Sequence, residues 1–381
     1  MNLSILIVLI SVLSILPNVA ESQSSNKSTK LTKTIIPPYP TSPNSIVYYT
    51  SNKLGDKLIQ LIVRELLKLS QSICLKFQKQ SSIANKIGIN FYYSKTKNYV
   101  KLSDSVNKPT KVFLKKDIAE NTNELLFFIG LALGLVPEIT RKYSNLFVKV
   151  ANDNISSSKL KYYQVKEYES KIKANSSFDH LSKMLSSPYF GSKNKEKTYT
   201  LKSNLAKYYE KIVYQTEFFS YNDIKRLWYL YCDQCKKYDC KNNGFYKYYC
   251  TRCDCPAPFT GNKCEKIQAN DKSCSNTQEL SASPVKNFHT LKNIQAPCSY
   301  LIKSPNGKRV KFEILYLNLS NRDACEKGYG VEVKYRNDKG AAGLVLCNNY
   351  ANISFPSASS EVYLMFSDTG NNNIRFSYSE V

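Results

Sequence analysis

The first residues to examine are those that could hold a metal ion or activate a water molecule. Protein zinc sites use histidine, cysteine and carboxylate side chains, and many catalytic sites use two or three imidazoles. The sequence contains 2 histidines, His180 and His289, which lie far apart in the chain. A site with three imidazoles therefore cannot form in this chain.

The thiols are more numerous and are clustered. Of the 12 cysteines only Cys74 precedes residue 232, and from Cys235 the spacing is C-x4-C-x9-C-x2-C-x-C-x8-C. An even number of cysteines in short segments indicates disulfides formed in an oxidising compartment. The segment is too small to bury a core of its own, so we expect disulfides to hold it together.

The elements that position these residues change in character along the chain. Residues 37–233 contain an apolar stripe at helical spacing between Leu58 and Leu69, strand-like runs, and the apolar run FFIGLALGLVPEITR at 127–141. These patterns predict an α+β domain. Residues 274–381 contain short alternating runs separated by turn residues, which predict an all-β sandwich. The small cysteine-rich segment at 234–266 lies between these two regions.

The N-terminus predicts export. Residues 1–22 read as a signal peptide, because an uncharged apolar run is followed by Pro17 and small residues. Residues 23–36 form a short polar segment, and no later stretch predicts a membrane span. We expect a secreted, extracellular protein, so nucleic acid is excluded as a partner. Candidate glycosylation sequons begin at Asn26, Asn154, Asn175, Asn318 and Asn352.

The formal net charge of +24 has two interpretations. It can reflect a codon bias that scatters lysines over solvated faces, or an attraction to acidic polysaccharide or an anionic cell surface. The expected partner is therefore an extracellular protein or glycan, or an acidic surface.

Two C-terminal segments resemble known extracellular modules. Residues 234–266 resemble an EGF-like module through CKNNGF and CDCPAPFTGNKC, and residues 274–381 resemble a CUB domain through GVEVKY, FSDTG and IRFSYSEV. The EGF-like resemblance implies three disulfides: Cys235–Cys250, Cys240–Cys253 and Cys255–Cys264. The CUB resemblance implies two more: Cys274–Cys298 and Cys325–Cys347.

The region before these modules resembles the astacin family of zinc metalloproteases, and the nematode members in particular. CLKF at 74–77 and NDIKRLWYLYC at 222–232 are similar to the first and last conserved segments of the family's catalytic domain. The resemblance implies a disulfide between Cys74 and Cys232, although Cys235 is close enough in sequence to exchange with Cys232.

The family's zinc signature is H-E-x-x-H-x-x-G-F-x-H-E-x-x-R, in which the spacing places three imidazoles and a general base around the metal. Gly134, Glu138 and Arg141 align with its retained scaffold residues. The alignment then places Phe127, Leu131 and Pro137 at the ligand positions and Phe128 at the general base. In an alternative register Glu124 remains as the base, but Asn123, Phe127 and Leu133 occupy the ligand positions.

FDHLSKMLS at 178–186 resembles the family's Met-turn. Met184 is retained, Ser186 replaces the tyrosine that touches the metal, and His180 falls at a scaffold position. Lys183 replaces a small apolar residue, and its charge would repel a metal ion if it points inward.

The resemblance implies a secreted homologue of a metalloendopeptidase whose catalytic residues are not intact. We expect no zinc or other cofactor, no catalysis, and a function in extracellular binding through the cleft and the CUB-like region. The alternative is a zinc metalloendopeptidase of the same family that uses non-standard ligands.

Overall fold

The computed structural model describes residues 34–213, 217–232, 235, 239–247, 250–275, 277–295, 297–320, 330–367 and 370–381. The predicted signal peptide, most of the polar segment after it, Asn26 and Cys325 lie outside the described residues. No helix in the described ranges is long and apolar enough to cross a membrane.

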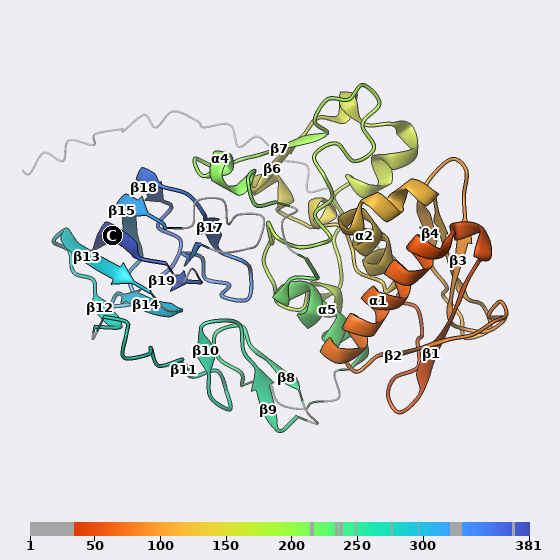
Figure 1. Cartoon of the computed structure of the whole chain (residues 1–381), viewed down its shortest axis with the longest axis horizontal. Coiled ribbons are helices and arrows are strands. Elements are labelled where there is room, and N and C mark those ends of the chain that lie inside the picture. Colours follow the sequence, from red (N-terminus) through yellow and green to blue (C-terminus); the bar gives the residue numbers. More distant parts are fainter. Residues whose placement is uncertain are drawn as a thin grey trace, which may run out of the picture. The chain divides into compact units, whose positions relative to one another are not determined.

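A five-stranded sheet forms the first part of the described chain (Figure 1). Its order is β2-β1-β3-β5-β4, and β4 is antiparallel to its neighbour while the other pairs are parallel. The strands are β1 (Ser45–Thr50), β2 (Lys76–Lys79), β3 (Ile89–Tyr93), β4 (Tyr99–Lys101) and β5 (Thr110–Leu114).

Two helices, α1 (Asp56–Ser72) and α2 (Thr122–Ala132), share a core with the inward-facing residues of this sheet. Alternate residues of β1 are buried, as a half-covered strand requires. In α1 Leu58, Ile62, Leu66 and Leu69 of the predicted apolar stripe are buried, but Leu67 on the opposite face is 59% exposed.

The chain after α2 is mostly irregular and is held together by short elements. They are β6 (Val148–Val150), β7 (Tyr199–Leu201), α3 (Ser170–Lys173), α4 (Ala206–Tyr209), α5 (Tyr221–Tyr231) and the 3-10 turns Glu138–Thr140, Ser144–Leu146, Asn152–Asn154 and Ser157–Tyr162. Two further 3-10 turns, Asn52–Leu54 and Lys116–Glu120, lie just before α1 and α2. Ser220 and Asp223 form a capping box that begins α5. A disulfide joins Cys74, just after α1, to Cys232 at the end of α5.

The cysteine-rich segment contains β8 (Phe245–Lys247), β9 (Arg252–Asp254), β10 (Phe259–Thr260) and β11 (Lys266–Ile267), paired as two hairpins. Its six cysteines form the pairs Cys235–Cys250, Cys240–Cys253 and Cys255–Cys264. With Cys74 bound to Cys232, the exchange between Cys232 and Cys235 that the sequence left open does not occur in this structure.

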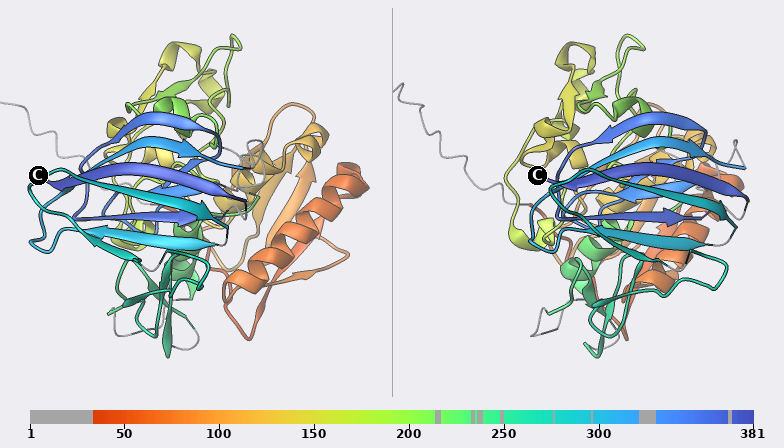
Figure 2. Two further views of the ribbon diagram at one scale, coloured as in Figure 1. Left: turned by 60° about the vertical axis from the view of Figure 1, so that its left-hand side comes forward. Right: turned by 90° about the vertical axis from the view of Figure 1, so that its left-hand side faces the viewer.

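The last part of the chain is a sandwich of two sheets (Figure 2). One has the order β12-β14-β19-β16-β17 and the other β13-β20-β15-β18. The strands are β12 (Glu279–Ser281), β13 (Asn287–Ile294), β14 (Cys298–Lys303), β15 (Val310–Asn318), β16 (Val331–Lys334), β17 (Leu344–Leu346), β18 (Tyr350–Phe355), β19 (Glu361–Phe366) and β20 (Asn372–Glu380).

Side chains from both sheets, such as Ile302, Phe312, Leu364 and Phe376, form the core of the sandwich. Cys274 is bonded to Cys298, and Cys325, the expected partner of Cys347, lies outside the described residues. The prediction of a mixed α/β region followed by a β-rich C-terminal region is therefore confirmed.

Candidate functional site

Helix α2 carries Phe127, Phe128 and Leu131 of the aligned metal signature, and the turn that follows the helix depends on glycine. Gly134 has φ +83°, and a Cβ there would lie 3.3 Å from both Pro37 Cδ and the Tyr231 hydroxyl oxygen. At Gly130 a Cβ would lie 2.5 Å from Met184 Sδ, so α2 packs directly against the segment that resembles the Met-turn. Met184 therefore packs against α2 at Gly130, whereas the turn at Gly134 packs against Pro37 and Tyr231.

The positions of the first imidazole and the general base are filled by an aromatic cluster. Phe127 and Phe128 are 1% and 0% exposed, and their ring centroids are 5.5 Å apart in an edge-to-face arrangement. The Phe127 ring also contacts Tyr162 at 5.9 Å and Phe190 at 5.2 Å. Such pairs add stability beyond the burial of their area, so these side chains act as core residues.

An ammonium group caps this cluster. Lys159 Nζ lies 5.5 Å from the centre of the Phe128 ring and 4.8 Å from that of Phe190, and it donates a hydrogen bond to the carbonyl oxygen of Asn98 at 3.1 Å. Burial lowers the pKa of this lysine. The phenyl rings offer no ligand atom and the ammonium would repel a divalent cation, so these residues do not fit zinc.

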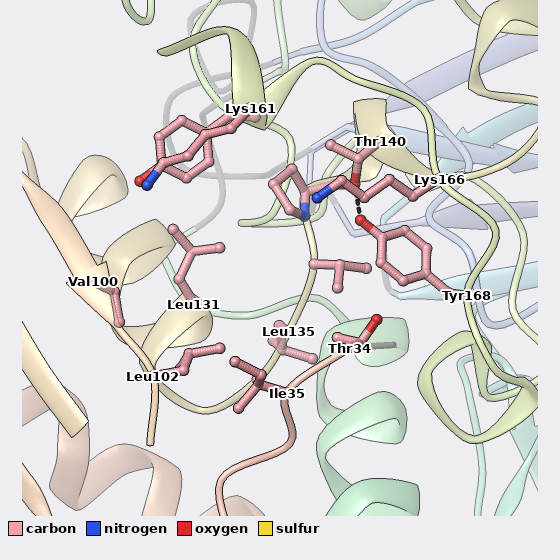
Figure 3. A pocket seen from close by; sticks show the side chains of 14 residues that line it. Thr34, Ile35, Val100, Leu102, Leu131, Leu135, Thr140, Lys161, Lys166 and Tyr168 are labelled. Atoms are coloured by element: carbon pink, nitrogen blue, oxygen red, sulfur yellow. Dashed lines mark hydrogen bonds between the residues drawn. The ribbon is translucent and has the colours of Figure 1, made fainter. Parts of the chain in front are cut away.

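Leu131 and Pro137, the other two ligand positions, line a cavity of about 260 Å³ (Figure 3). Val100, Leu102 and Ile35 form its apolar side. Its remaining lining residues are Thr34, Gly134, Leu135, Val136, Thr140, Lys161, Tyr162, Lys166 and Tyr168.

The polar side of the cavity is basic. Lys161 and Lys166 extend into it, and no carboxylate is among the described residues that line it (Figure 3). Burial and then repulsion by Lys97 and Lys166 lower the pKa of Lys161. The hydroxyl groups of Thr140 and Tyr168 are bonded to each other at 2.7 Å. The cavity therefore offers apolar contact together with two lysine side chains, and no acidic residue is among its described lining residues.

The backbone of the segment around Met184 is bonded to the 3-10 turn Glu138–Thr140 that follows α2. Met184 is 0% exposed, and its carbonyl oxygen accepts a hydrogen bond from Glu138 N at 2.9 Å. Ser186 is also buried, and its carbonyl oxygen accepts a bond from the Tyr199 hydroxyl at 2.7 Å. Lys183 is buried and donates to Asn123 Oδ1, and burial lowers its pKa to about 8.

The retained Glu138 and Arg141 belong to a buried charge cluster. Glu138 accepts from Arg141 Nη1 at 3.0 Å and from Arg226 Nη1, and Arg226 also lies 3.4 Å from Asp223. Asp179 N donates to Glu138 at 3.3 Å. Burial, with repulsion from Asp223 and Glu138, raises the pKa of Asp179 to about 6. Because every member is buried, the cluster fixes chain segments and does not face the cavity.

Three charged residues of this region, Lys159, Arg226 and Asp179, were not predicted from the sequence. Arg226 and Asp179 lie within NDIKRLWYLYC and FDHLSKMLS, the two segments that resemble the family. Charged residues inside segments expected to be buried could have indicated a buried ion pair. Lys159 lies in no recognised motif, and only the folded chain places it over the rings.

The two histidines are far from forming a pair. His180 stacks on Tyr209 with ring centroids 4.0 Å apart, and it contacts Phe147 and Phe178 edge to face. Burial lowers its pKa well below the usual value, so it is a neutral core residue at pH 7. His289 lies on β13 of the sandwich.

The alternative register also places no imidazole, thiolate or carboxylate at its ligand positions, which are Asn123, Phe127 and Leu133. Glu124 Oε1 accepts a hydrogen bond from Asn98 Nδ2 at 3.0 Å, and Leu133 is the buried C-cap of α2. Among the described residues, no three His, Cys, Asp or Glu side chains are grouped in a way that could hold a metal ion.

The described sequons differ in exposure. Asn175, Asn318 and Asn352 are exposed, whereas Asn154 is half-buried and its Nδ2 donates to the carbonyl oxygen of Lys197 at 2.8 Å. Asn154 is therefore the least accessible of these four candidates.

Comparison with known proteins agrees with the resemblance seen in the sequence. Residues 39–232 match the model of the astacin family of peptidases. The zinc metalloproteinase nas-34 of Caenorhabditis elegans is 26% identical over 253 residues, covering 65% of this chain and 40% of the relative. The zinc metalloproteinase nas-36 of Caenorhabditis briggsae is 30% identical over 202 residues, covering 49% of this chain and 32% of the relative.

The chain thus spans less than half the length of these two curated relatives. Among solved structures, high choriolytic enzyme 1, a hatching enzyme zinc-protease from the medaka fish Oryzias latipes, aligns with a TM-score of 0.43 at 18% identity. That alignment covers 51% of this chain and 94% of the fish enzyme. Because the family model matches half of the chain, the protein belongs to the astacin family of peptidases.

Proposed function

We propose that this protein is a secreted, catalytically inactive member of the astacin family that binds extended extracellular peptides in its residual cleft. The observation that carries this proposal is the replacement of the metal-site side chains by a packed aromatic cluster under Lys159, beside a cavity that remains open. In this proposal the cavity is the place for a ligand, and the side chains at the aligned metal-site positions, Phe127, Phe128, Leu131 and Pro137, carry no group that would polarise a water molecule.

The topology favours an extended peptide as the ligand. Strand β4 lies at the edge of the five-stranded sheet, and among the described strands it pairs only with β5. Val100 of this strand lines the cavity, so a peptide that pairs with the free edge would pass directly over it. Lys161 and Lys166 favour acidic side chains on such a peptide, and Leu131 and Leu102 favour apolar ones.

We also propose EGF-like and CUB identities for residues 234–266 and 274–381. The three disulfides of the first segment and the two-sheet sandwich of the second support this interpretation. In this proposal they are binding modules that act together with the cleft.

The first experiment measures metal content and hydrolysis on the purified secreted chain. We expect substoichiometric zinc and no chelator-sensitive peptidase activity. One zinc per chain, lost together with peptidase activity upon chelation, would refute inactivity and favour a metalloendopeptidase with non-standard ligands.

The second experiment measures binding of a short labelled peptide in which leucine and aspartate alternate. Lys161→Glu should weaken binding about tenfold, because it reverses a charge at the cavity wall. Lys171→Glu makes the same charge change at an exposed position on α3 and should leave affinity unchanged. Equal losses in both variants would show that net charge, and not the cleft, attracts the peptide.

A further inference from the structure

The solvent-facing side of the five-stranded sheet carries a continuous row of aromatic rings. The rings belong to Tyr49 on β1, Tyr92 on β3, Phe113 on β5 and Tyr99 on β4, which are consecutive strands of the sheet. Successive ring centroids are 6.4, 5.3 and 4.5 Å apart, and the last two pairs are stacked. We call these four side chains the aromatic row.

The register of the strands explains why the rings meet. Phe113 is the direct cross-strand partner of both Tyr92 and Tyr99, and Tyr49 is paired with Asn90, two residues before Tyr92. All four rings are only partly buried, because helices α1 and α2 pack with the alternate side chains of these strands. Partner residues on neighbouring strands share one face of a sheet, so the row is a property of the fold.

Lysines surround the far end of the row. Lys97 Nζ lies 5.5 Å from the centre of the Tyr99 ring, and Lys101 Nζ lies 6.0 Å from that ring and 6.0 Å from that of Phe113. Lys111 on β5 is the direct cross-strand partner of Lys101, and both are exposed. None of these three lysines has an ion-pair partner among the described residues.

The repulsion among these three lysines destabilises the pairing of β4 and β5. Like charges directly opposite each other on neighbouring strands destabilise the pairing. The Lys101–Lys111 pair has this geometry, and Lys97 adds a third charge nearby. A ligand with several negative charges would relieve the repulsion at the same place where aromatic surface is available.

The ligand that fits this chemistry is a linear acidic polysaccharide. Sugar rings present apolar C–H faces that pack on aromatic side chains, while sulfate and carboxylate groups pair with ammonium groups. Strands in a sheet are spaced about 4.8 Å apart, so a row across four strands is about 15 Å long. That length matches a few sugar residues of a chain whose charges repeat along it.

We propose that the aromatic row, together with Lys97, Lys101 and Lys111, binds an acidic polysaccharide carrying sulfate or carboxylate groups on successive sugars. Tyr99 and Lys101 alternate with Val100 along β4, so the row and the cavity use opposite faces of this strand. The proposal does not depend on the function proposed for the cleft. Lys97 also repels the charge of Lys161 in the cavity, so the two sites are close enough to influence each other electrostatically. A glycan bound on the row would therefore hold the cleft close to the extracellular matrix.

The test uses the full secreted chain and a heparin oligosaccharide as the probe. Lys101→Gln combined with Lys111→Gln should weaken binding about tenfold, because the ligand loses two local charge contacts. The matched control combines Lys149→Gln with Lys292→Gln, two exposed lysines on β6 and β13, and should weaken binding less than about twofold. Equal losses in the two double variants would overturn the proposal, because diffuse net charge would then explain the binding.

The aromatic contribution is tested separately. Tyr99→Ala should weaken heparin binding about fivefold without changing its salt dependence, because an uncharged contact is lost. Tyr189→Ala, at a tyrosine that is 54% exposed elsewhere, should have no effect. The lysine variants, which involve exposed side chains only, keep the test valid if Tyr99→Ala fails to fold.

The last experiment tests whether the site prefers a polysaccharide to other polyanions. A poly-glutamate peptide and single-stranded DNA of matched charge should bind at least about tenfold more weakly than heparin, because neither offers sugar faces with charges at this spacing. Equal affinity for all three polyanions would overturn the assignment to a glycan.

Discussion

Restoring the metal-site side chains should not restore an enzyme. The variant combines Phe127→His, Phe128→Glu, Leu131→His, Pro137→His and Ser186→Tyr. Phe127 and Phe128 are 1% and 0% exposed and pack on Phe190, so their loss removes core contacts from both rings. Each buried phenylalanine removed typically costs about 3–5 kcal/mol, so the two together approach the total stability of many domains, about 5–15 kcal/mol.

Electrostatics oppose the metal as well. Lys159 Nζ lies 5.5 Å from the centre of the Phe128 ring, so a divalent ion held by side chains of the same helix would face a positive charge close by. The buried amine of Lys183 adds a second positive charge to the Met184 segment. Zinc binding would have to overcome both the packing loss and this repulsion.

The assay compares the five-residue variant, the wild-type chain and a Phe288→His control, whose side chain is 56% exposed. We measure the free energy of unfolding, zinc content and peptidase activity. The expected result is strong destabilisation with weak zinc binding and no activity, while the control unfolds like the wild type. Stoichiometric zinc with chelator-sensitive proteolysis, and an unfolding free energy within about 1 kcal/mol of the wild type, would refute the reasoning.

Three further predictions concern stability. Glu138→Gln should lower the free energy of unfolding by about 3–5 kcal/mol, because Arg226 and Arg141 lose the negative charge that they share in the interior. Chemical denaturation measures this free energy, and a loss below about 1 kcal/mol would contradict the prediction. The pKa of Asp179, about 6, lies above the value of about 3.9 expected in the unfolded chain, so its ionisation destabilises the fold increasingly between about pH 4 and 6. Asp179→Asn should therefore gain about 2–3 kcal/mol relative to the wild type between pH 4 and 7, and a difference that does not change with pH would contradict the shift. Replacing Cys74 and Cys232 together by alanine opens a loop of 158 residues and should lower the free energy of unfolding by about 5 kcal/mol; unchanged thermal unfolding of the variant would show that the bridge does not constrain the unfolded chain.

Much of the architecture could be predicted because it depends on local patterns. The apolar spacing from Leu58 to Leu69 predicted α1, and the alternating C-terminal runs predicted the β-rich region. Gly134, Glu138 and Arg141 could be aligned because their order along the chain matches the family's signature. Leu67 belongs to the same apolar run but is exposed, because it lies on the face of α1 that points away from the core.

The sequence by itself determined which ligand types are present near the signature, because Phe127, Leu131 and Pro137 carry no side-chain donor in any conformation. Only the tertiary structure decided what surrounds them. Lys159 is distant from Phe128 in sequence and reaches its ring through the fold, and the aromatic row joins Tyr49 and Tyr99 across four strands. Such contacts depend on strand order and register, which short-range periodicity does not specify.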